Sequence, residues 1–112
     1  MVEQRQNFKT ITPQILVGAT PTRLSSIDLF VRTVIIESAQ GNTGLIFISD
    51  SEANSTTTNR HTLSFPGDAI SMTSAEYGNL NAEINLKELW VHGTNPGDKI
   101  VVSYLEITGN FI

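Results

Sequence analysis

The chain has 112 residues, a net charge of −4 at pH 7 and no cysteine, with 39% hydrophobic and 16% charged residues. This length fits one domain, and the lack of cysteine excludes a disulfide scaffold, a thiolate metal site and a cysteine nucleophile. The seven basic residues are scattered along the sequence, so nucleic acid and anionic membranes are disfavoured as partners.

Residues 1–13 are expected to form an extended arm outside the core. The segment "MVEQRQNFKTIT" is polar, with Phe8 and Ile11 as isolated apolar residues, and Pro13 disfavours a helix. It holds no apolar stretch typical of a signal peptide, so we expect synthesis in a cytoplasm without export. Residues 14–112 are expected to form one β domain, beginning with a short strand in "QILVG" (14–18).

Two apolar runs in the first half of the domain predict a β-hairpin. The runs "IDLFVRTVIIES" (27–38) and "LIFISD" (45–50) are rich in β-branched and aromatic residues, which favour strands. The Gly- and Asn-bearing segment "AQGNTG" joins them, as in a hairpin. The following segment, "SEANSTTTNR" (51–60), predicts a mobile surface loop.

Two nearly identical turns, "FPGD" (65–68) and "NPGD" (95–98), predict strand connections. Pro66 and Pro96 preset φ at the first central position, and Gly67 and Gly97 supply a positive φ at the second, which is the type II combination. Such a turn needs no ligand to explain it, so these four residues are interpreted as structural.

In the third quarter of the domain, the apolar residues change from even to odd positions. In "EINLKELWVHG" the apolar positions shift by one near residues 87–88, which predicts a bulge there or a short turn before a strand at 89–92. The last long strand is expected at 99–108. Together these signals predict seven or eight short strands in an antiparallel β-sandwich or jelly roll.

The last strand, "KIVVSYLEI", is apolar on both faces. A two-layer sandwich gives each strand one core face and one wet face, so strict alternation is expected. We infer that Val101, Leu105 and Ile107, or else the opposite parity, contact another subunit of a closed dimer or trimer. The alternative is that a loop or the N-terminal arm folds back over these residues.

No residue pattern indicates catalysis, a cofactor or a metal site, so the chain is not expected to be an enzyme. His61 and His92 lack the spacing of a zinc motif, and Asp50 and Glu52 lack the spacing of a calcium loop. The alternative of a small jelly-roll enzyme would need a metal, which elemental analysis would detect.

Trp90 and Tyr104 could form a sugar-stacking platform, but aromatic residues within strands are normally packed. Packing within the strands is therefore the favoured interpretation of Trp90 and Tyr104, and a joint sugar-stacking platform is the weaker one.

The elements "VRTVIIESAQGNTGLIFISD", "LSFPGDAISM" and "LKELWVHGTNPGDKIVVSYLEI" resemble those of small β-sandwich virion proteins of tailed bacteriophages, the capsid decoration (cement) or head-fibre type. The resemblance covers about residues 27–107. It implies a structural protein on the capsid surface, commonly a homotrimer, with the major capsid protein as partner and synthesis in the host cytoplasm.

On this interpretation the chain oligomerises and bridges neighbouring capsid subunits to stabilise the head. The arm would contact the shell through Val2, Phe8, Ile11 and Pro13. The alternative is a head- or tail-fibre adhesin module that binds host surface glycans. A glycan-array signal that Trp90→Ala abolishes without loss of fold would distinguish it.

Overall fold

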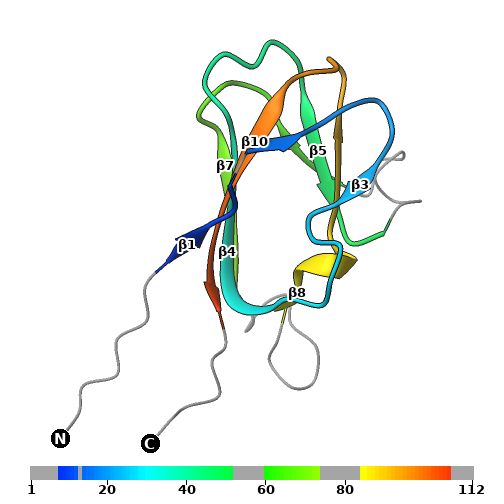
Figure 1. The fold of residues 1–112 in the computed structure, drawn as a ribbon. Helices are drawn as coiled ribbons and strands as arrows, with labels where there is room; N and C mark the ends of the chain where they lie inside the picture. The colour runs from blue at the N-terminus through cyan, green and yellow to red at the C-terminus, as the bar shows by residue number, and fades with distance from the viewer. Residues whose placement is uncertain (1–7, 13, 52–59, 74–83, 107–112) are drawn as a thin grey trace, which may run out of the picture.

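The predicted β-sandwich is confirmed: two antiparallel sheets pack face to face in the computed structural model, which describes residues 8–12, 14–51, 60–73 and 84–106 (Figure 1). The six-stranded sheet contains β1 (Lys9–Thr10), β2 (Ile15–Leu16), β4 (Phe30–Ser38), β7 (Ala69–Thr73), β8 (Ile84–Asn85) and β10 (Lys99–Glu106). The four-stranded sheet contains β3 (Thr22–Arg23), β5 (Ile46–Ser49), β6 (His61–Leu63) and β9 (Trp90–Gly93).

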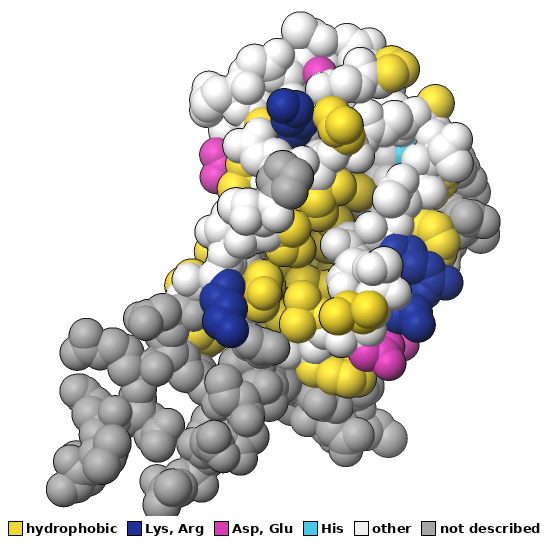
Figure 2. All heavy atoms as spheres, viewed as in Figure 1, with side chains coloured by type: hydrophobic (Ala, Val, Ile, Leu, Met, Phe, Trp, Pro, Cys, Tyr) yellow, Lys and Arg dark blue, Asp and Glu magenta, His cyan; other side chains and the backbone are white. Residues whose placement is uncertain are grey.

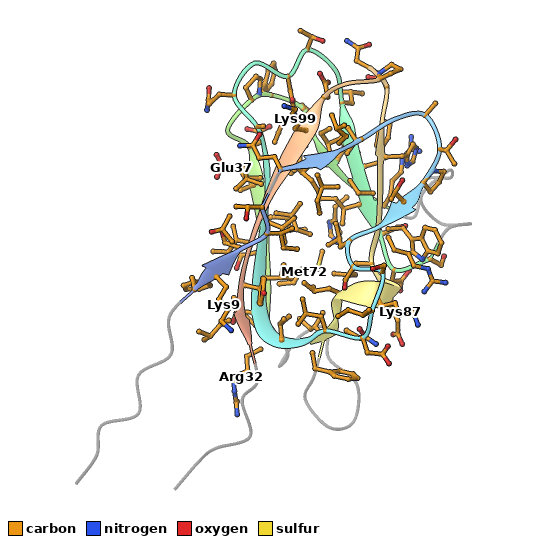
Figure 3. The ribbon with its side chains drawn as sticks, in the orientation of Figure 1. Lys9, Arg32, Glu37, Met72, Lys87 and Lys99 are labelled. Atoms are coloured by element: carbon orange, nitrogen blue, oxygen red, sulfur yellow. The ribbon has the colours of Figure 1, made fainter. Side chains whose placement is uncertain are left out.

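The core lies between the two sheets and is built from aliphatic side chains. On β10, Ile100 and Val102 are fully buried and Tyr104 packs against the core, so these three residues form its inner face. The buried Met72 of β7 points into the same space, whereas Glu37 of β4 lies on the outer side of the sheet (Figure 3). The structure thus decides which apolar face of the last strand is core, a choice that the sequence left open.

The predicted hairpin between residues 27–38 and 45–50 is wrong. β4 belongs to the six-stranded sheet and β5 to the four-stranded sheet, so the "AQGNTG" segment carries the chain from one layer to the other. The two Pro-Gly turns do the same, since they connect β6 with β7 and β9 with β10. The physical reason is local: tight hairpins favour type I′ or II′ turns, whose twist matches paired strands, whereas type II turns splay the strands.

Both Pro-Gly turns have the predicted type II geometry at the glycine. Gly67 and Gly97 have φ values of +89° and +95°. In each turn the N–H of the aspartate donates to the carbonyl of the residue three positions earlier, Asp68 to Phe65 at 3.0 Å and Asp98 to Asn95 at 3.2 Å. Gly41 makes a third positive-φ turn, with φ +90° and a bond from Asn42 N–H to the Ala39 carbonyl.

A buried polar cluster joins the first and third of these turns along the chain. The carboxylate of Asp98 accepts the N–H groups of Thr43 (3.2 Å) and Gly44 (2.8 Å). The Asn42 side chain accepts the Lys99 N–H (2.8 Å) and donates to the Lys99 carbonyl (2.6 Å). Because buried backbone groups need partners, these two side chains fix the loop after β4 against the start of β10.

The phase change near residues 87–88 is a short turn, one of the two predicted alternatives. β8 ends at Asn85, a 3₁₀ turn η1 follows at Leu86–Glu88, and β9 begins at Trp90 in the other sheet. The Asn85 side chain caps η1 by accepting the Lys87 N–H at 3.1 Å. The turn therefore carries the chain from the six-stranded to the four-stranded sheet. The apolar positions shift by one residue because the two sheets face the core from opposite sides.

The predicted boundary of the N-terminal arm needs correction. Lys9–Thr10 pairs with β10, the Ile11 N–H donates to the Val102 carbonyl at 2.9 Å, and Ile11 packs against the core. The described part of the arm, residues 8–12, is thus tied to the edge of the six-stranded sheet. Residues 1–7 and 13 lie outside the described residues, as do 52–59 of the predicted loop, 74–83 and 107–112.

Candidate functional site

The outer face of the six-stranded sheet is poor in charge across its middle. The register places Ser103 of β10 opposite Ile35 of β4, and Ile35 opposite Ser71 of β7. Val101 is opposite Glu37, and Leu105 is opposite Thr33. Val101, Leu105 and Ile35 are partly exposed, so this face carries aliphatic side chains among small hydroxyl groups.

Two of the three residues predicted for a subunit contact share this outer face. Val101 and Leu105 lie on it, and Ile107 lies outside the described residues. At the edge of the same face stands Leu16, which is 61% exposed and is opposite Lys99. An antiparallel sheet with one wet face normally presents polar side chains there, so the sequence anomaly persists in the folded molecule.

The outer face of the four-stranded sheet is basic and aromatic. Phe47 of β5 and His92 of β9 are opposite each other, with ring centroids 4.9 Å apart. The Arg60 guanidinium lies 3.6 Å from the centre of the Phe47 ring. Both rings are buried although they point away from the core, and Arg60 explains part of that burial.

Trp90 lies on this outer face, but its partner is an arginine and not a tyrosine. The register places Arg23 of β3 opposite Trp90, and the Arg23 guanidinium lies 4.7 Å from the Trp90 ring centre. Tyr104 faces the core from the other sheet. The idea of a platform made jointly by Trp90 and Tyr104 is therefore wrong, because the two side chains belong to opposite layers.

His92 holds an unpartnered polar atom. Its Nδ1 is buried and has no hydrogen-bond partner among the described residues. Burial lowers the pKa of His92 below its ordinary value of 6.5, and the positive charge of Arg60 lowers it further. The ring is therefore held neutral in the folded protein at pH 7.

Stability is expected to fall with acidification because of this histidine. Below about pH 6.5 the unfolded chain binds a proton at His92 that the folded protein does not, so unfolding becomes easier as the pH decreases. Thermal melts between pH 7.5 and pH 5, in steps of about 0.5 pH unit, should show a smaller decrease of Tm for His92→Phe than for the wild type. The matched control is His61→Phe at the exposed histidine of β6, which makes the same substitution away from the Phe47–His92 contact. Equal slopes for wild type and His92→Phe would contradict the assignment.

The residues considered for metal binding do not come together. No group of three or more His, Asp and Glu side chains that could hold a metal ion occurs within residues 8–51 and 60–106 as far as they are described. Glu52 lies outside the described residues, and Asp50 is exposed at the end of β5. No helix in the described part of the chain is long and apolar enough to cross a membrane.

The residues predicted for shell contact differ in how exposed they are. Phe8 is 53% exposed at the start of β1, whereas Ile11 is partly buried against the chain's own core. Val2 and Pro13 lie outside the described residues. The N-terminal segment thus presents Phe8, but not Ile11, as an exposed apolar anchor.

Comparison with known proteins adds no assignment. No protein-family model, no curated protein and no solved structure matches this chain.

Proposed function

We propose that the chain is a capsid decoration protein of a tailed bacteriophage, a homo-oligomer that bridges neighbouring capsid subunits. The observation that carries the proposal is the outer face of the six-stranded sheet, where Val101, Leu105 and Ile35 stand among hydroxyl side chains. The sequence resemblance supplies the type of assembly.

The first step of the proposal is self-association through this face. Transfer of apolar surface out of water contributes about 25 cal/mol per Å², so covering the aliphatic side chains of this face favours association. Glu37 lies between Val101 and Ala69 in the middle of this face, and Lys99 stands opposite Leu16 at its edge. A copy of the chain could therefore cover it without burying many charges, which would otherwise be costly. The expected state is a trimer.

The second step is attachment of the oligomer to the shell. Each copy of the major capsid protein offers one weak contact, and an oligomer that makes several contacts at once binds far more tightly than one subunit alone. Bridging of this kind resists separation of the shell subunits and so stabilises the head. The protein would then be located on the capsid surface.

The N-terminal segment is proposed as one shell contact. Phe8 is exposed, and residues 1–7 precede it in the chain. Ile11 is withdrawn from this role because it packs against the core. The shell contact is accordingly assigned to Val2 and Phe8, with Pro13 retained as a proposal.

The glycan-binding alternative is less favoured by the geometry. A neutral sugar stacks on a bare aromatic ring, and Arg23 already lies over the Trp90 ring. We therefore retain the decoration role as the main proposal.

Deletion of residues 1–7 tests the attachment step. Because β1 begins at Lys9, the truncated protein keeps β1 and should remain a folded oligomer, yet it should no longer bind empty heads in a co-sedimentation assay. The matched control is Phe8→Ser in the full-length chain, which should weaken binding less than the deletion. Unchanged sedimentation of the truncated protein with heads would contradict the role of the segment. Mass analysis of purified virions should find this chain at a fixed copy number per major capsid subunit.

A further inference from the structure

The outer face of the four-stranded sheet gathers basic and aromatic side chains in two neighbouring rows. The first row is Arg23, Trp90 and Ser49, and the second is His92, Phe47 and Thr62. Neither row contains an aspartate or a glutamate. In a chain with a net charge of −4, this face differs in charge from the rest of the molecule.

Two guanidinium groups on this face lie over aromatic rings. Arg23 stacks on Trp90 at 4.7 Å and donates from Nη1 to the Lys87 carbonyl at 3.1 Å, while Arg60 stacks on Phe47 at 3.6 Å. Arg23 is exposed and forms no ion pair with a carboxylate of the described residues. Arg23 gives one N–H to the Lys87 carbonyl, and a guanidinium has further N–H donors that can recognise a carboxylate in bidentate fashion.

The composition of the face matches the centre of a protein interface. Such centres are enriched in Trp, Phe and Arg and depleted in Lys, Glu and Asp, and Trp and Arg supply most of the binding energy. Lys87, whose carbonyl binds Arg23, extends the basic region (Figure 3). Asp and Glu side chains adjoin Lys and Arg side chains on this side of the molecule (Figure 2). Carboxylates flank the rows, since Asp50 directly follows Ser49 and Glu88 of η1 lies two residues before Trp90. The basic character is therefore confined to the rows themselves.

We propose that this surface, the Arg23 face (Arg23, Arg60, Thr62 and Trp90), docks onto an acidic protein surface whose carboxylates accept hydrogen bonds from the Arg23 guanidinium. The inference rests on the proposed function, since it names the chemistry of a second contact with the shell. A protein partner is favoured over an acidic glycan because guanidinium groups lie over the aromatic rings, where a sugar ring would stack.

The only tryptophan of the chain provides the measurement. Poly-L-glutamate is titrated into the full-length protein at about 20 mM salt, and the fluorescence of Trp90 is followed, since long-range attraction is strong at low ionic strength. We expect a saturable change that about 300 mM salt abolishes. Arg23→Gln should weaken binding about three- to tenfold, in keeping with the loss of a charge-assisted pair.

The control variant is Arg32→Gln, which makes the same change of charge on the six-stranded sheet. Figure 3 shows Arg32 near the start of β4, on the other side of the molecule from Lys87. This variant should bind within about twofold of the wild type, because only the total charge has changed. Equal weakening by both variants, or no response of Trp90, would overturn the proposal.

Polygalacturonate of the same charge density distinguishes the two classes of partner. Binding at least about threefold weaker than that of poly-L-glutamate supports a protein partner, since a stiff sugar chain aligns fewer carboxylates with the Arg23 face. Equal or tighter binding overturns it in favour of an acidic glycan. None of these results depends on whether the chain is found in virions, so failure here and failure of the decoration role are separate outcomes.

Discussion

Val101→Lys combined with Leu105→Lys is expected to convert the proposed oligomer into folded monomers. Both side chains lie on the outer face of the six-stranded sheet, and two lysines buried between copies would leave unpaired charges at the contact. We expect the dissociation constant to rise at least about 100-fold. The monomer should stay folded, because the lysine that replaces Val101 would stand opposite Glu37, a favourable cross-strand pair of opposite charge.

Size-exclusion chromatography with light scattering measures this change, and circular dichroism checks the fold. Thr62→Lys is the matched control, since it places a lysine on an exposed strand position of the other sheet. The control should remain oligomeric. Dissociation by Thr62→Lys alone, or an unchanged oligomer in the double variant, would move the contact away from the proposed face.

Asp98→Ala is expected to cost about 3 kcal/mol of folding free energy. The Asp98 carboxylate is buried and satisfies the N–H groups of Thr43 and Gly44 in a place where water has little access. Asp68→Ala makes the same change in the other Pro-Gly-Asp turn. There the carboxylate accepts the N–H groups of Ser64 and Phe65 at 3.1 and 3.0 Å but is partly exposed, so water can take its place.

Urea denaturation of the two variants at one protein concentration gives the comparison. Asp68→Ala should cost about 1 kcal/mol of folding free energy, so the two variants should differ in stability by about 2 kcal/mol. In a thermal melt, Asp98→Ala should lower Tm by about 12 °C, taking about 4 °C for each kcal/mol. Equal losses in the two variants would show that burial of the carboxylate is not what matters.

The parts of the fold that depend on local chemistry could be predicted from the sequence. The type II geometry at Gly67 and Gly97 follows from Pro followed by Gly, and the shift of apolar phase marked the turn at η1. In the structure Gly41 has a positive φ in a turn of the same kind, which does not suit two directly paired strands. The hairpin prediction for residues 27–50 took nearness in sequence as pairing, and the structure places the two strands in separate layers.

The parts that depend on long-range contact could not be predicted. The pairing of Lys9–Thr10 with β10 joins the two ends of the chain and leaves no local pattern. Both faces of β10 are apolar, so only packing against the other sheet decides that Ile100 and Val102 are core and that Val101 is not. Trp90 was singled out from the sequence, but the Arg23 stack follows from the register of β3 with β9.

The account depends most on the claim that other copies of the chain cover the outer face of the six-stranded sheet. Sedimentation equilibrium of the untagged wild-type protein over a concentration series from about 0.1 to 100 µM tests it directly. The account predicts a closed oligomer, a trimer by the proposed function, that persists into the low micromolar range. A single species with the 12.2 kDa mass of one chain at every concentration would contradict it.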